Sequence, residues 1–339
     1  MTDDHAVDIA PARSQGFGRD LPDAHPERIA PGSALYTMLC DATVGLYSVP
    51  LFLLPLLHPA TAASTDRYDG AFQGDPTDAR RFALRLADTM ETISGVVYAV
   101  DESEHVGFSI RELHRNLGGE LPSGQRYHPW EPEVWTWNWA AISAAILDVF
   151  GGLRGFPDDD FRDEAYLGLV ELGRRFEVRG MPDSYDEFAA MWPALRDEIA
   201  DPTTPAMQRV IGTLSRGNLA PSGAFARLPG WMWEAVTLPL RHTQRVAVRV
   251  AMPEHFHEAA GLGQGRWGKP AVRMHVGAWR LVPRRASHEI GLRTLQAHHR
   301  HGRPAWRGRF SAERLADARR RGRKSRGAPS GDEVSTDGD

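Results

Sequence analysis

Apolar residues recur with the spacing of buried helix faces along most of this chain. Positions three and four residues apart predict eight helices, over residues 76–98, 110–117, 131–150, 159–177, 185–199, 205–216, 231–250 and 253–261. Residues 34–60 add apolar helical segments that end at His58-Pro59. Between 263 and 290 the periodicity is weak, and residues 274–282 suit a short strand. Strands do not alternate with helices, so the pattern predicts an all-α, bundle-like fold.

Composition divides the chain into three parts. Residues 1–30 are rich in Asp, Pro and Gly and predict a flexible segment, and residues 31–290 predict one large helical domain. Residues 291–339 predict a disordered, low-complexity tail. The net charge of −4 conceals a basic block, because residues 291–327 hold twelve Arg and Lys against two acids. Such a block can contact an anionic membrane surface or a nucleic acid, or it can simply solubilise the chain.

The sequence predicts neither a secretory signal nor a membrane-spanning helix. The first twenty residues are polar and acidic, which is untypical of a signal peptide. The strongest apolar run, Val44–Leu57, has fourteen residues and contains Pro50 and Pro55. It is too short and too broken for a span and predicts kinked core helices or an interfacial segment. We therefore expect a soluble, cytoplasmic protein. The single Cys40 excludes an intrachain disulfide, and its apolar surroundings predict a buried thiol.

A histidine occupies the apolar face of the helix predicted over 110–117. Ser109 and Glu112 form a capping box before it, and two glycines follow it. Ile110, Leu113, His114 and Leu117 then share one face. A histidine in such a place is more often bonded to a carbonyl than to a metal. However, a neutral imidazole in a dry helical bundle is also what the iron of a porphyrin needs as an axial ligand.

A second candidate group lies on the long helix predicted over 76–98. Arg81, Arg85 and Thr89 recur every four residues and therefore share a face. An arginine and a threonine four residues apart can together hold an anion or a bound oxygen species. The alternative is that both arginines are solvated, with Asp78 and Asp88 as local partners.

Several short motifs occur together in a characteristic order. They are His58-Pro59, Asp75-Pro76, Arg85-x-x-x-Thr89, Ile110-Arg111-x-x-His114, Gly118-Gly119, Gly124, Tyr127, Trp135-x-Trp137 and Gly180-x-Pro182. This order over residues 35–250 resembles the catalytic domain shared by the fungal MpaB oxygenases and the bacterial latex-clearing proteins, which are rubber oxygenases.

The resemblance implies an all-α domain that encloses one b-type haem, and an oxidoreductase. His114 takes the position of the proximal iron ligand, and Arg85 and Thr89 take haem-pocket positions. There they would stabilise charge on bound oxygen. The implied partners are dioxygen and a small apolar substrate, for example an isoprenoid-like one, which would undergo oxidative C=C cleavage or oxygen insertion.

This chain departs from the family pattern at two positions. Asp88 stands where latex-clearing proteins carry a lysine, and Asn138 stands where the family often has a histidine. Two alternatives therefore remain at this stage. One is a non-catalytic haem protein, such as a sensor or a carrier. The other is a haem-free helical scaffold with a basic docking tail.

Overall fold

The computed structural model describes residues 21–68, 117–214, 227–259 and 268–301, together with positions 89, 92, 93, 96, 110 and 114. This part of the chain is mostly helical, which confirms the predicted all-α class. The first helices are η2 (Pro26–Ile29), α1 (Ala34–Leu39), α2 (Ala42–Leu46), α3 (Pro50–Leu53), η3 (Pro55–Leu57) and α4 (Pro59–Tyr68). The later ones are α7 (Pro132–Arg154), α8 (Asp159–Arg175), α9 (Tyr185–Ile199), α10 (Pro205–Leu214), α11 (Gly230–Ala251), α12 (Glu254–Ala259), α13 (Gly268–Leu281) and α14 (Arg284–His301).

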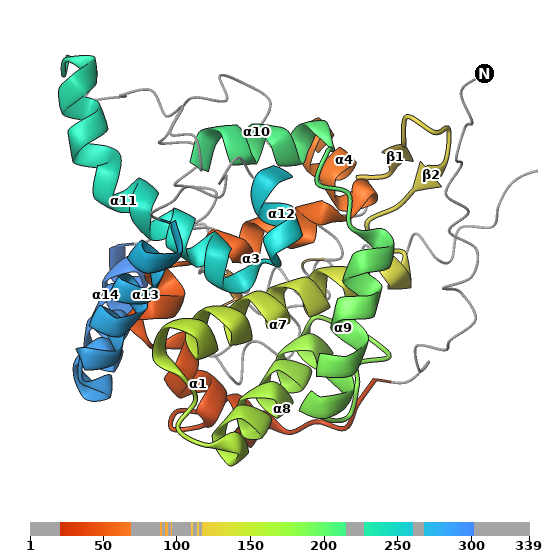
Figure 1. Ribbon diagram of the computed structural model, residues 1–339. Coiled ribbons are helices and arrows are strands. Elements are labelled where there is room, and N and C mark those ends of the chain that lie inside the picture. The colour runs from red at the N-terminus through yellow and green to blue at the C-terminus, as the bar shows by residue number, and fades with distance from the viewer. Residues whose placement is uncertain are drawn as a thin grey trace, which may run out of the picture.

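Helix α7 runs through the middle of the molecule, and other helices cover it on several sides (Figure 1). It begins with Pro132, whose missing N–H is not needed in a first turn, and it stops at Gly155, whose φ of 70° suits a residue without Cβ. Between these ends most of its side chains are buried, including Trp137, Trp139 and Phe150. It packs against α2, α3, α4, α8, α11 and α13. The predicted helix over 131–150 is confirmed, with four more residues at its end.

The apolar run Val44–Leu57 lies within the core. It forms α2, α3 and η3, and the last two begin at Pro50 and Pro55. Leu51, Leu53, Leu54 and Leu57 are almost fully buried, and α3 and η3 pack against α7. The prediction of broken core helices is therefore confirmed. No helix among the described residues is both long and apolar enough to cross a membrane.

Helices α8 and α9 begin and end close to their predicted limits because their caps are local. Asp158 accepts a hydrogen bond from the Phe161 N–H at 2.7 Å and so starts α8. Ser184 accepts from the Glu187 N–H at 3.3 Å and so caps the start of α9. The Glu187 carboxylate accepts a hydrogen bond from the Asp183 N–H at 3.1 Å. In a standard capping box it would accept from the N–H of the capping residue itself, which is one position later.

The described residues include a short antiparallel hairpin, and they correct an expected strand. In the hairpin, β1 (Gly119–Glu120) pairs with β2 (Arg126–Tyr127). The strand considered over 274–282 is wrong, since these residues belong to α13. Val272, Val276 and Trp279 lie four and three residues apart and pack on the core beside α7. This helical period outweighs the apparent alternation.

Helix α14 runs from Arg284 to His301 and so continues past residue 290, where the predicted tail begins. Buried polar contacts hold it and the end of α13 to the body. The Ser287 hydroxyl donates to Asp41 Oδ1 at 2.7 Å, and Arg154 Nη1 donates to the carbonyls of Trp279 and Val282. Gly291 lies so close to the Cys40–Ala42 backbone that a Cβ there would overlap it. The helix pair is thus docked firmly on α2 and α7. Residues 1–20 of the segment predicted to be flexible, and the part of the predicted tail beyond His301, lie outside the described residues, whereas residues 21–30 are described and include η2.

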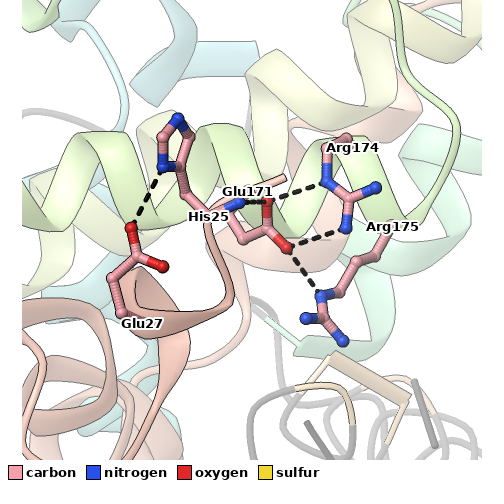
Figure 2. Close-up of polar contacts among 5 residues, drawn as sticks. All are labelled: His25, Glu27, Glu171, Arg174 and Arg175. Carbon is pink, nitrogen blue, oxygen red and sulfur yellow. Dashed lines mark hydrogen bonds and ion pairs between the residues drawn. The ribbon is translucent and has the colours of Figure 1, made fainter. Parts of the chain in front are cut away.

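A buried carboxylate attaches the N-terminal segment to α8. Glu171 accepts hydrogen bonds from Arg174 Nε at 2.8 Å, Arg175 Nε at 2.9 Å and the His25 backbone N–H at 3.0 Å (Figure 2). The Glu171 side chain is fully buried. Burial alone would raise its pKa, but the hydrogen bonds from Arg174, His25 and Arg175 hold the pKa below its ordinary value. The charged form is therefore the stable one in the fold.

We expect Glu171→Gln to lower the free energy of unfolding by about 3 kcal/mol at neutral pH, because it leaves two arginines without their buried counter-charge. Urea unfolding followed by circular dichroism measures the difference. The matched control is Glu289→Gln, which breaks an exposed pair with Arg293 and should change stability by less than about 0.5 kcal/mol. The contribution of Glu171 is present above about pH 4.5 and disappears at lower pH as this carboxylate is protonated. Equal effects of the two substitutions would contradict the assignment.

Candidate functional site

The structure describes two of the three predicted site residues. Thr89 and His114 both lie in helical backbone and are half-buried, while Arg85 lies outside the described residues. Thr89 shares a helix face with Ile93 and Val96, which follow at i+4 and i+7 and are buried in the main core. The Thr89 side chain is therefore on the core-facing side of its helix. Arg85 precedes it by four residues, and its place on this face stays a prediction.

The hydrogen bond of His114 fixes which nitrogen carries the proton. His114 Nδ1 lies 2.8 Å from the carbonyl oxygen of Ile110, one turn earlier in the same helix. A carbonyl can only accept, so Nδ1 must be the donor. In the neutral ring the lone pair then belongs to Nε2. This is the tautomer in which a histidine binds a metal through Nε2 while its other nitrogen is held by a backbone carbonyl.

An aromatic pair supports the His114 ring from α7. Trp135 meets His114 edge to face, with ring centroids 5.9 Å apart. The Trp135 indole N–H donates to the Phe176 carbonyl at 2.8 Å, and Trp130 stacks on Trp135 at a centroid distance of 4.7 Å. The indole is thereby fixed by a hydrogen bond at its edge and by a ring on its face. It can act as a rigid wall that limits rotation of the imidazole.

His58 carries its proton on the other ring nitrogen from His114. Its Nδ1 accepts from the Ala60 N–H at 3.1 Å, so the neutral ring carries its proton on Nε2. Its ring packs edge to face on Trp137, with centroids 5.7 Å apart. Burial lowers the pKa of His58 to about 4, so the ring is neutral at physiological pH. His58 therefore serves as the N-terminal cap of α4, and its tautomer does not suit a ligand that binds through Nε2.

The helix face that carries Trp135 also carries Asn138 and Ile142. All three are half-buried and fall at i, i+3 and i+7 of α7, whereas most of their neighbours are buried. Thr61 of α4 donates to Asn138 Oδ1 at 3.2 Å. Asn138, one of the two residues that depart from the family pattern, is thus held by a side chain of α4.

The described residues include a donor of the kind that a haem needs. No group of three or more His, Cys, Asp or Glu that could hold a metal occurs among them. A haem brings four nitrogen ligands of its own and asks the protein for one axial imidazole. His114 offers such an imidazole in the required tautomer, so the residues present fit the group.

Sequence reasoning found His114 but missed its supports. Trp135 was part of a recognised motif, yet its contact with His114 joins residues twenty-one positions apart and belonging to different helices. The contributions of Phe176, Trp130 and Thr61 likewise depend on tertiary packing. No local signal in the sequence identifies these three.

Comparison with known proteins gives one match. A family model described as "ER-bound oxygenase mpaB/B'/Rubber oxygenase, catalytic domain" matches residues 36–307. The match begins within α1, continues past the end of α14, and so extends further toward the C-terminus than the residues on which the resemblance was first seen. No curated protein and no solved structure matches the chain.

We expect His58→Asn to remove part of the pH dependence of stability without loss of the helix cap. An unfolded histidine binds its proton near pH 6.5 and the folded one near pH 4, so acidification through this window favours unfolding. The wild-type chain should lose about 2 kcal/mol more than the variant between pH 7 and pH 5. Asparagine can still accept from the Ala60 N–H, since it is a preferred capping residue. Urea unfolding at the two pH values measures the difference, and equal losses in both proteins would contradict the assignment.

Proposed function

The chain belongs to the mpaB/rubber oxygenase catalytic-domain family, and on this basis we propose that it is a haem-dependent oxygenase that acts on an apolar substrate. Membership supports oxygenase chemistry in general and an oxidoreductase as the class of enzyme. The haem, the substrate and the individual roles are parts of the proposal. The observation that carries it is the hydrogen bond from His114 Nδ1 to the Ile110 carbonyl, beside the fixed ring of Trp135.

In this proposal His114 holds a b-type haem through Nε2, and Arg85 and Thr89 lie in the haem pocket. When bound, the haem supplies the activation of dioxygen. The protein supplies the orientation of the imidazole. The Ile110 carbonyl accepts a hydrogen bond from Nδ1, and this donation raises the basicity of Nε2, while Trp135 limits the ring from one side.

Arg85 and Thr89 would provide fixed donors where negative charge develops. A guanidinium keeps its charge at any physiological pH, and a threonine hydroxyl can donate one hydrogen bond. Such donors are most effective where water is excluded and where they need not reorient. The burial of Ile93 and Val96 on the face shared with Thr89 supports a dry environment there.

The substrate would be apolar and of the kind that carries a C=C bond. In this proposal the Val44–Leu57 run and α7 would line the substrate site, and both are dominated by Leu, Val, Ala, Phe and Trp. Such a lining offers few hydrogen bonds to a polar ligand and favours hydrocarbon. Isoprenoid-like olefins with oxidative cleavage or oxygen insertion are therefore the substrate and reaction classes we propose.

A non-catalytic haem protein is the second candidate. Asn138 favours it, because this side chain replaces a histidine that is frequent in the family and is engaged by Thr61. The two candidates differ in one measurement. An oxygenase consumes dioxygen when an olefin is added to the reduced, haem-loaded protein, whereas a sensor or carrier shows no turnover.

We expect His114→Ala to abolish stable haem binding, because it removes the axial ligand. The measurement is the Soret absorption after reconstitution of the purified variant with haem. Added imidazole should restore much of the band by replacing the missing side chain. His255→Ala is the matched control, since His255 is exposed on α12, and it should keep the spectrum of the wild type. A full Soret band in His114→Ala without imidazole would contradict the assignment. The absence of a band in the wild type would favour a haem-free scaffold.

We expect Thr89→Val to keep the haem and to lower the rate of olefin-dependent dioxygen uptake at least about tenfold, because it removes a donor but preserves shape. An oxygen electrode measures the rate, and the Soret band confirms equal loading. Thr92→Val is the control, since Thr92 is a half-buried threonine one turn away on the same helix. Equal rates for the two variants would exclude a catalytic role for Thr89.

A further inference from the structure

Helix α13 has an outer face that its position in the fold does not explain. Its inner face is used, because Val272, Val276 and Trp279 pack on a core cluster with Tyr47. Trp279 Nε1 donates to the Tyr47 hydroxyl, and His275 bonds to the same oxygen. The helix is therefore anchored on one side, and solvent would be expected to meet polar residues on the other.

The outer face instead carries exposed apolar side chains in a row. The row has the spacing i, i+4, i+8 and i+11 and consists of Pro270, Met274, Ala278 and Leu281. Met274 is 76% exposed and Leu281 is 85% exposed. After the turn into α14, Ile290 is also exposed, at 53%. Large apolar side chains at this exposure, repeated along one line, are typical of a surface that meets a partner.

Positive charge borders this row. Residues 268–301 contain seven Arg and Lys and one acid, Glu289, which pairs with Arg293 at 2.7 Å. The exposed Arg273 and Arg280 alternate with the apolar row, and Arg285 follows on α14. No ion pair of these three arginines occurs within the described part of the chain. We call Pro270, Arg273, Met274, Ala278, Arg280, Leu281 and Arg285 the basic-apolar face.

We propose that the basic-apolar face docks on the surface of an anionic lipid bilayer, with Met274 and Leu281 inserted at the headgroup boundary and Arg273 and Arg280 on the lipid phosphates. Aliphatic side chains flanked by arginines are the pattern of an interfacial amphipathic helix. A nucleic acid would engage the arginines but would offer little contact to the aliphatic row. The proposal is independent of haem binding and of oxygenase activity.

Charge also argues against two other partners for the basic-apolar face, which are the C-terminal part of the chain and a second copy of the protein. Residues 302–327, which follow α14, hold ten Arg and Lys against two acids, so they would be repelled by the basic-apolar face. Two such faces would likewise repel each other in a symmetric dimer. An anionic bilayer would attract the arginines and would also accommodate the apolar row. The basic residues after His301 would add to the same attraction.

The docked face would be rigidly connected to the core. Ser287 bonds to buried Asp41, and Arg154 of α7 bonds to the carbonyls of Trp279 and Val282. Substitutions on the outer face leave all these contacts in place. Variants of Arg273, Met274, Arg280 and Leu281 should therefore fold, and circular dichroism with thermal unfolding confirms it.

The test is flotation of the full-length protein with phosphatidylcholine vesicles, with and without phosphatidylglycerol. We expect binding to the phosphatidylglycerol vesicles that weakens at high salt, and little binding to pure phosphatidylcholine. Arg273→Glu with Arg280→Glu should weaken binding at least about twenty-five-fold, since each arginine near an anionic surface contributes about fivefold. The control is Arg126→Glu at an exposed position of β2, which makes the charge change of one of these two substitutions away from the basic-apolar face and should leave binding nearly unchanged.

The apolar component is tested separately. Met274→Ser with Leu281→Ser should lower vesicle partitioning about tenfold or more at fixed salt, because two large side chains no longer enter the headgroup boundary. Leu21→Ser, at a residue that is 38% exposed in the N-terminal segment, should have little effect. Equal partitioning of the double serine variant and the wild type would overturn the insertion that we propose.

Other occupants give different results. If deletion of residues 302–339 abolishes binding while the double glutamate variant binds normally, the contact belongs to those residues and the proposal fails. If binding appears only after residues 1–20 are removed, the acidic N-terminal segment covers the face and the proposal fails. A dimer that the double serine variant disrupts, in a protein that binds no vesicles, would assign the face to a second copy.

Discussion

Helix α7 must be covered on almost every side, and this requirement organises the molecule. Twenty-three residues that are mostly Ala, Val, Ile, Leu, Phe and Trp cannot face water along any full length of the helix. The surrounding helices pack against α7 from several directions, and the Val44–Leu57 run supplies one of these contacts. At the C-terminal end Arg154 is buried, and its guanidinium donates hydrogen bonds to the carbonyls of Trp279 and Val282 at the end of α13. At the other end the same helix places Trp135 against His114.

Features with local causes were the ones that the sequence could predict. The caps at Asp158 and Ser184 and the prolines that open α3 and α7 act within one turn, so the helix limits follow from neighbouring residues. Even the hydrogen bond of His114 is local, since its acceptor lies four residues earlier. Features that depend on packing were missed. Residues 274–282 resembled a strand because exposed Met274 and Leu281 interrupt the helical pattern, and the turn over 119–127 closes a hairpin that its glycines alone do not specify.

The candidate site shows the same division. The position of His114 on an apolar face could be inferred from spacing, and the family motifs gave it a chemical role. Its supports could not be inferred, because Trp135, Trp130 and Phe176 meet only when α7 and α8 are in place. The two proposals also concern one physical problem. An olefin with few polar atoms dissolves poorly in water and partitions into lipid, so an enzyme that takes such a substrate gains from resting at the bilayer surface.

The close approach of Gly291 to the Cys40–Ala42 backbone has a consequence for the lone thiol. Cys40 is 1% exposed, and α14 lies directly over the turn that carries it. A reagent can reach this sulfur only when α14 lifts from α2 or when the surrounding core opens. The rate at which a thiol reagent labels Cys40 therefore reports the free energy of that local opening. The molecule thus contains a native, single-site probe of helix undocking, without the need for an introduced label.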